Sequence, residues 1–166
     1  MEEMRLFKSI LFAFLPIFLI LLFIGKVSAA VPQVSPRPVD VNSYEIFWPV
    51  VAGKVQGDSL YSLKLLKEQV RGLFIISDSK KAEYFSFLST KRLVEFEKLV
   101  LVKKDYDNAA RTLKAYEENL KKGVNVETFN NQLSLLEVVL VKVDDLQKPL
   151  VQKAILILNS QLEKLR

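Results

Sequence analysis

Apolar side chains recur at intervals of three and four positions from residue 60 to residue 165, and this spacing constrains the fold more than any other feature. An α-helix has about 3.6 residues per turn, so side chains at this spacing share one helical face. A half-buried strand needs an apolar residue at every second position instead. We therefore expect an all-α domain, an antiparallel bundle or array of four to five helices whose apolar faces pack around a dry interior.

Capping residues and helix breaks divide this region into five expected helices. Asp58 or Ser59 can accept the free N–H groups of a first turn, and Gly123 is a typical helix end. The expected helices start at Asp58 or Ser59, at Ser77 to Ser79, at Asp105, at Asn125 and at Pro149; the first three end near Ile75, Lys104 and Gly123. The apolar face of the first helix consists of Leu60, Leu63, Leu66, Val70 and Leu73.

The segment 138–143 fits two kinds of secondary structure. Its β-branched residues and alternating tail are typical of a strand, whereas the apolar residues from Phe129 to Val143 follow helical spacing. No partner strand is apparent in the sequence. We expect a helix here, with the strand as an open alternative.

The N-terminal segment has the composition of a targeting sequence. Arg5 and Lys8 precede an apolar run, residues 9–25, without charged side chains, and Val27-Ser28-Ala29 supplies the small residues typical of signal-peptidase cleavage. A membrane anchor needs about 17 to 25 such residues, so the run is also long enough to remain in a bilayer. Residues 1–29 are therefore expected to form a signal peptide or a signal anchor.

The expected location and partners follow from this targeting segment. Prolines at positions 32, 36 and 38 predict an extended linker over residues 30–43, and the helical domain then covers residues 44–166. This domain is expected outside the cytoplasm, either secreted or anchored to the cytoplasmic membrane by residues 9–25. Its expected partners are the membrane itself, another envelope protein or an anionic cell-wall polymer. Export argues against nucleic acid, despite a formal net charge of +5.

An aromatic stretch, residues 44–51, precedes the first expected helix and is too short for a confident helix of its own. We expect it to be an extended strap over the domain. Phe47 and Trp48 then either pack into the core or lie in a lipid headgroup layer, as aromatic residues near membranes often do.

The absence of histidine and cysteine removes most familiar catalytic and metal sites. Carboxylates remain, and the adjacent pairs Glu117 with Glu118 and Asp144 with Asp145 point in different directions on a helix. No glycine-rich phosphate loop or nucleophile elbow is present. The sequence predicts no enzymatic activity, no cofactor and no metal. A carboxylate-based enzyme acting on cell-wall glycan is the catalytic alternative.

Five side chains are candidates for structural roles. Asp58 is expected to cap the first helix, and Tyr61 to bury its ring while its hydroxyl finds a carbonyl or water. Arg92 falls on the inward stripe of the second helix. A buried guanidinium requires partners, and Glu68 and Glu117 are the expected ones.

Four spaced motifs carry a resemblance to known sequences. They read G-D-x-L-Y-x-L-K at residues 57–64, K-A-E at 81–83, L-x-x-x-R-L-x-E at 88–95, and A-x-x-x-L-x-x-Y-E-x-x-L at 109–120. Over about residues 55–122 the chain thereby resembles a bacterial family of extracytoplasmic helical domains of unknown function. One departure is Phe85-Ser86-Phe87, which is bulkier than the family pattern. The resemblance implies a helical domain behind a signal or single membrane span, in some cases with a role in envelope signalling, and implies no activity.

These features favour a non-catalytic, extracytoplasmic domain of the bacterial cell envelope that acts as an interaction or structural module. The first alternative is a membrane-anchored sensor, in which residues 9–25 couple the outer domain to a cytoplasmic partner.

Overall fold

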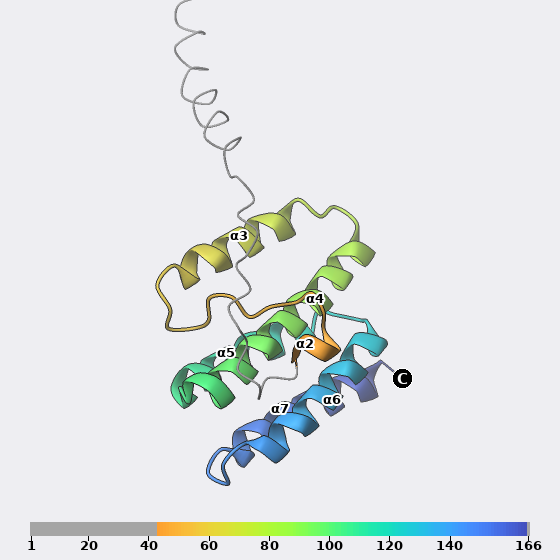
Figure 1. The fold of residues 1–166 in the computed structure, drawn as a ribbon. Coiled ribbons are helices and arrows are strands. Elements are labelled where there is room, and N and C mark those ends of the chain that lie inside the picture. Colours follow the sequence, from red (N-terminus) through yellow and green to blue (C-terminus); the bar gives the residue numbers. More distant parts are fainter. Residues whose placement is uncertain (1–42, 166) are drawn as a thin grey trace, which may run out of the picture. The chain divides into compact units, whose positions relative to one another are not determined.

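The computed structural model describes residues 43–165, and every regular element in that range is helical (Figure 1). The elements are α2 (Ser43–Ile46), α3 (Tyr61–Leu73), α4 (Asp78–Glu97), the π-helical η1 (Lys98–Lys103), α5 (Tyr106–Leu120), α6 (Val126–Lys142) and α7 (Lys148–Lys164). Five of them, α3 to α7, are long α-helices that pack against each other, so the predicted all-α class is confirmed. The targeting segment expected at residues 1–29, and residues 30–42 of the expected linker, lie outside the described range.

Helices α4 to α7 form the body of the domain. Helix α4 packs mainly on α5, α6 packs on α7, and contacts of α4 with α6 and of α5 with α7 join the two pairs. Helix α3 lies at the outside, away from α6 and α7 (Figure 1). Within residues 43–165, no helix has the length and apolar character needed to cross a bilayer.

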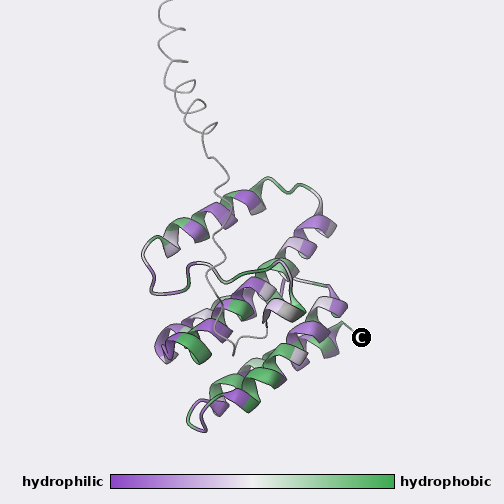
Figure 2. Cartoon of the chain, viewed as in Figure 1, coloured by the Kyte–Doolittle hydropathy of each residue, from purple (hydrophilic) through white to green (hydrophobic). Residues whose placement is uncertain are grey.

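The interior of the body is apolar, as the helical spacing predicts. Figure 2 shows apolar residues concentrated along α6 and α7, whereas α3 alternates between apolar and polar positions. Fully buried members of the core include Leu93, Phe96, Leu99, Ala109, Leu120, Phe129, Leu135, Leu136, Val151 and Leu158.

One polar network crosses this apolar core. Gln132 is fully buried; its amide nitrogen donates to Ser89 Oγ and Thr90 Oγ1, each at 2.9 Å, and its amide oxygen accepts from Tyr116 Oη at 2.9 Å. Buried polar groups are costly unless they are paired. The network therefore fixes the register of α4, α5 and α6, since sliding any of them would break these bonds.

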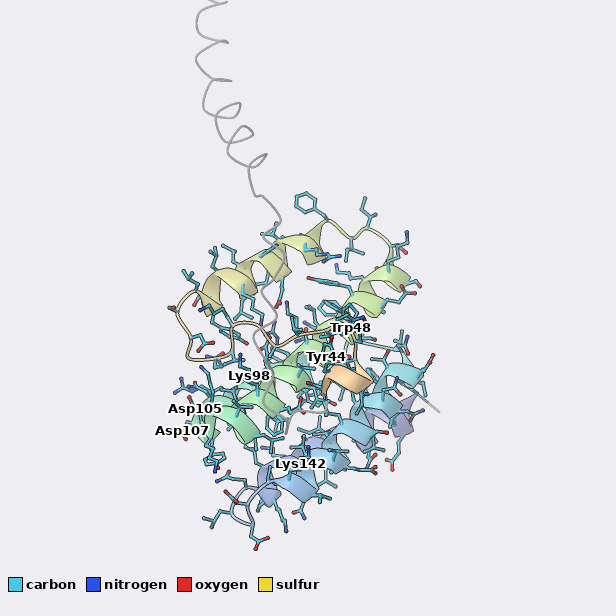
Figure 3. All side chains as sticks on the ribbon, viewed as in Figure 1. Tyr44, Trp48, Lys98, Asp105, Asp107 and Lys142 are labelled. Carbon is cyan, nitrogen blue, oxygen red and sulfur yellow. The ribbon has the colours of Figure 1, made fainter. Side chains whose placement is uncertain are left out.

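Two of the predicted helix starts are capped by the expected side chains. Asp105 Oδ1 accepts from the Asn108 N–H at 3.2 Å, and Asn125 Oδ1 accepts from the Thr128 N–H at 2.8 Å. Figure 3 shows Asp105 at the beginning of α5. Pro149 lies in the first turn of α7, where its missing N–H is not needed. The predicted break between the last two helices is therefore confirmed.

The start of α3 differs from the expectation. Leu60 is its N-cap residue, with a left-handed φ of 67° and no side-chain cap. Asp58 Oδ2 instead accepts from the Val55 N–H at 2.8 Å, and its other oxygen binds Lys103. Asp58 thus stabilises the turn before the helix, and its expected capping role is wrong.

The segment 138–143 is helical up to Lys142, and Val143 still donates its N–H to Val139 O at 3.1 Å. Val139 and Val143, four positions apart, are buried, whereas Val141 between them is 84% exposed, as expected for a helix that turns one face to the core. The described residues contain no strand, and this decides between the two structures that the sequence left open.

Residues 44–51 are partly helical rather than wholly extended, because α2 occupies the first part and Ser43 N donates to the buried Glu97 side chain at 3.2 Å. Phe47 is buried in the core, whereas Trp48 is 63% exposed. Figure 3 shows Tyr44 and Trp48 next to each other, with ring centroids 4.3 Å apart. The two aromatic residues therefore have different environments, although the sequence suggested one for both.

Candidate functional site

The side of α3 that faces α4 is polar and charged. Three of its residues, Tyr61, Lys64 and Glu68, are spaced by three and four positions and therefore share one helical face. They contact three residues of α4. We call the connected set the α3–α4 ion cluster; it consists of Tyr61, Lys64, Glu68, Lys91, Arg92 and Glu95.

Arg92 lies at the centre of this cluster, with its side chain 2% exposed. Its guanidinium binds the carboxylates of Glu68 and Glu95 and donates to Tyr61 Oη at 2.8 Å. A guanidinium remains charged in proteins and carries five N–H donors, so its burial requires several acceptors. The two carboxylates and the phenol oxygen supply them from both helices.

Tyr61 connects the arginine to the second carboxylate. Its hydroxyl accepts from Arg92 and donates to Glu95 Oε2 at 3.0 Å. Burial, and then the adjacent Glu95 carboxylate, raise the pKa of Tyr61 far above its ordinary value. The hydroxyl therefore keeps its proton, which the bond to Glu95 requires.

Lys64 extends the cluster to the segment before α3. Its ammonium group pairs with Glu95 and donates to the backbone carbonyls of Ala52 and Lys54, at 2.8 and 2.6 Å. Burial lowers the pKa of Lys64 to about 8, while the Glu95 carboxylate opposes the shift. At neutral pH one charged group thus holds together α3, α4 and the 50–56 segment.

Lys91 is the second cationic partner of the Glu68 carboxylate. Its Nζ lies 2.5 Å from Glu68 Oε1, while Arg92 binds the other oxygen of that carboxylate. Burial lowers the pKa of Lys91, and Glu95 opposes this shift. Tyr84 Oη also donates to the backbone carbonyl of Glu68 at 2.9 Å. Both the side chain and the backbone of Glu68 therefore attach α3 to α4.

Three of the five residues selected from the sequence, Tyr61, Glu68 and Arg92, lie together in this cluster. Asp58 lies outside it, and the hydrogen bond from Lys103 lowers its pKa. Glu117 also lies outside; it pairs with Lys121 of its own helix at 2.7 Å, at a partly exposed position. The partnership expected between Arg92 and Glu117 is therefore wrong.

The other three members, Lys64, Lys91 and Glu95, were not selected from the sequence. Glu95 follows Arg92 by three positions and so shares its inward face, which is a signal that spacing alone provides. Lys64 stands between Tyr61 and Glu68 on the same helical face. This signal was obscured because the more regular apolar pattern of α3 suggested the opposite side as the inner one.

The apolar side of α3 is exposed. We call it the outer stripe; it consists of Leu63, Leu66, Val70, Leu73 and Phe74, with exposed fractions of 59, 54, 43, 79 and 80%. The expectation that the apolar face of the first helix packs inside the domain is therefore wrong. The reason is physical: the ion cluster occupies the other side of α3, and one helix cannot turn both sides inward.

A surface hollow lies elsewhere among the described residues, between η1 and the end of α6. This groove has a volume of about 320 Å³ and is lined by Val100, Leu101, Lys104, Tyr106, Lys142, Val143 and Asp144. Asp144 is the single carboxylate of this lining, whereas Asp145 pairs with Lys148 at 2.6 Å. Across the described range, no three carboxylates lie close enough to hold a metal ion.

The cluster acts as a structural attachment. Each carboxylate oxygen of Glu68 and Glu95 has a cationic or hydroxyl partner within the protein, so none is directed at a substrate position. The domain thus combines a satisfied ionic contact between α3 and α4 with an exposed apolar stripe on the other side of α3.

Comparison with known sequences places this architecture in a family. A family model described as "Domain of unknown function" (DUF5667) matches residues 53–163, about two thirds of the chain. The match extends past residue 122, where the motif resemblance ends, and includes α6 and nearly all of α7. No curated protein and no solved structure matches the chain. The chain therefore belongs to the family described as domain of unknown function DUF5667.

Proposed function

We propose that this chain is a non-catalytic, extracytoplasmic domain of the bacterial cell envelope that serves as an interaction module. The outer stripe of α3 is the observation that carries the proposal. Contiguous apolar side chains on a soluble surface are a feature of interaction sites. In this domain they occupy the face that α3 turns away from its own core.

The arrangement of the acidic groups supports a non-catalytic role. Glycosidases need two carboxylates that face each other across a substrate cleft. Here the two converging carboxylates, Glu68 and Glu95, are both bound to Arg92. The groove next to η1 has a single carboxylate, Asp144.

The composition of residues 1–29 supports the location. Two basic residues, an apolar run and a small-residue cleavage motif are the parts of an export signal. Retention of residues 9–25 in the membrane would keep the domain at the outer surface of that membrane. Cleavage after Ala29 would release it instead.

A labelling experiment tests the location. The chain has no cysteine, so Val141→Cys, at a site that is 84% exposed, introduces one reporter thiol. A membrane-impermeant maleimide should label this variant on intact spheroplasts when the chain is anchored, or in the surrounding medium when it is released. A matched variant without residues 1–29 should be labelled only after lysis. Equal labelling of both variants before lysis, or labelling of neither variant in the spheroplasts and in the surrounding medium, would contradict export.

Two further measurements complete the test. Mass spectrometry of the product distinguishes an anchored chain that starts at Met1 from a released chain that starts at Ala30. Incubation of the purified chain with peptidoglycan should release no soluble fragments. Release that disappears in a Glu95→Gln variant would contradict the non-catalytic role.

A further inference from the structure

We propose that the outer stripe of α3 lies in the headgroup region of an anionic lipid bilayer, with the axis of α3 parallel to the membrane plane. This inference names the partner of the interaction face and rests on the proposed function for one point, the placement of the domain beside a membrane. Four observations support it.

The first observation is the direction of the apolar side chains. The outer stripe follows the helical spacing from Leu63 to Phe74, and the exposed Ile76 (96%) continues it beyond the helix end. Helices that bind membrane surfaces have one apolar face and one polar face, and they insert the apolar face. In α3 the polar face is already bound to the rest of the domain through the ion cluster.

The second observation is the charge along the edge of the stripe. Lys67 and Arg71 are exposed and four positions apart, so they lie along the edge of the stripe. The Arg71 guanidinium also lies over the Tyr84 ring of α4, 5.6 Å from its centroid, so Arg71 lies at the border between the stripe and the α4 contact. The single acidic residue of α3, Glu68, is turned to the opposite side and bound by Lys91 and Arg92. The outward side of α3 therefore carries positive charge alone, as a surface that meets anionic lipid headgroups requires.

The third observation concerns the alternative partner, a second copy of this chain. Two copies of α3 that met through their outer stripes would bring their rows of Lys67 and Arg71 close together. No acidic residue of α3 is available outside the cluster to compensate these charges. Charge complementarity therefore favours an anionic surface over self-association.

The fourth observation is the short length of chain between the apolar run, residues 9–25, and α2. Residues 26–42 connect it to α2, and an extended chain of this length reaches at most about 60 Å. An anchored domain thus stays within this distance of the bilayer, which raises the effective concentration of α3 at the lipid surface. Weak apolar and ionic contacts are then sufficient for docking.

Fluorescence of single-cysteine variants of the full-length chain tests the proposal. Leu66→Cys, in the outer stripe, and Val141→Cys, on α6, each receive an environment-sensitive nitrobenzoxadiazole label. The labelled chains are reconstituted into vesicles of phosphatidylcholine with phosphatidylglycerol. We expect a blue shift at position 66 and several-fold stronger quenching by brominated acyl chains there than at position 141.

A charge reversal and a change of lipid identify the source of the attraction. Lys67→Glu combined with Arg71→Glu, in the Leu66→Cys background, should lose most of the quenching while the helical content by circular dichroism stays the same. Vesicles of phosphatidylcholine alone should give the same loss with the original charges. Quenching that stays the same after the charge reversal and in phosphatidylcholine vesicles would overturn the assignment to anionic lipid.

Two other outcomes would also overturn the docking proposal. One is equal, water-like emission from positions 66 and 141 in anionic vesicles. The other is a blue shift at position 66 without lipid that grows with protein concentration, because this identifies a second copy as the partner.

A third label separates docking from anchoring. Leu19→Cys, in the apolar run, reports insertion of residues 9–25. Quenching at position 19 but not at position 66 contradicts the docking of α3 and supports the membrane anchor. Quenching at 66 but not at 19 supports docking and contradicts a membrane anchor.

Discussion

Helices α3 and α6 are both amphipathic, yet they turn opposite faces toward the domain. In α6 the residues Phe129, Leu135 and Leu136 are fully buried, and apolar packing holds the helix. In α3 the one buried residue is Tyr61, and ionic contacts through Arg92 hold the helix. Apolar spacing therefore identifies which side chains share a face, but not whether that face points to the core or to the surroundings.

The largest expected difference in stability is between a phenylalanine buried in α6 and a phenylalanine exposed beside α3. Phe129→Ala should lower the free energy of unfolding by about 4 kcal/mol, because it empties a fully buried site in α6. Phe74→Ala, at a site that is 80% exposed beside α3, should change it by less than about 0.5 kcal/mol. Urea unfolding followed by circular dichroism measures both. Similar losses in the two variants would show that the outer stripe is packed in solution.

The next prediction addresses the attachment of α3. Arg92→Met should lower the free energy of unfolding by about 3 kcal/mol, since Glu68 and Glu95 lose their shared buried cation. Lys121→Met removes the partner of Glu117 at the surface and should cost less than about 0.5 kcal/mol. Hydrogen exchange should show the greatest loss of protection in α3. An Arg92→Met variant as stable as the original would mean that α3 is held by other contacts.

A smaller effect is expected at the polar network in the body. Gln132→Leu should cost about 2 kcal/mol, because the buried Tyr116 hydroxyl loses its acceptor. The double variant with Tyr116→Phe should recover part of this loss, as it removes the unpaired hydroxyl. Gln69→Leu, on the exposed side of α3, should change stability by less than about 0.5 kcal/mol. Thermal unfolding compares the stability of the original chain, the two single variants and the double variant. A Gln132→Leu variant as stable as the original chain would contradict the role of the network.

The smallest predicted effect is a dependence on pH. Lys64 has a pKa of about 8 in the folded domain and an ordinary value of 10.5, so above pH 8 the unfolded chain binds more protons. Stability should therefore rise between about pH 8 and pH 10, by about 1 kcal/mol because the side chain is partly exposed. Above about pH 10 the raised pKa of Tyr61 acts in the opposite direction.

A matched variant assigns this rise to its residue. In Lys64→Met the increase in the free energy of unfolding between pH 8 and pH 10 should shrink. A remainder is expected from Lys91, whose pKa is also lowered by burial. Urea titrations at several pH values provide the measurement, and identical pH profiles for both proteins would exclude Lys64 as the source.

The fold of the body was predictable because its signals are local. Asp105 and Asn125 cap their own helices, and the core residues of α4 to α7 repeat at helical spacing. The sequence pattern did not decide whether residues 138–143 are a helix or a strand, because β-branched residues suit both a strand and a buried helix. The structure shows that they are helical up to Lys142. Gln132 could have been recognised from its position, three residues after the buried Phe129.

The candidate site was predictable in part. The position of Arg92 on an inward stripe indicates a buried cation that needs partners, and Glu68 is one of them. The choice between Glu68 and Glu117 depends on which helices pack side by side, which a linear pattern does not contain. Asp58 was assigned to the wrong turn because the left-handed backbone of Leu60 leaves no trace in the sequence.

The hydrogen bonds from Lys64 to the carbonyls of Ala52 and Lys54 have a mechanical consequence. Lys98 Nζ also donates to Gly53 O at 3.0 Å, and Val55 is fully buried in the core. A pull that enters the domain at Ser43 would therefore reach α3 through Lys64 and η1 through Lys98. The 50–56 segment would thus divide the load between the outer helix and the body of the domain.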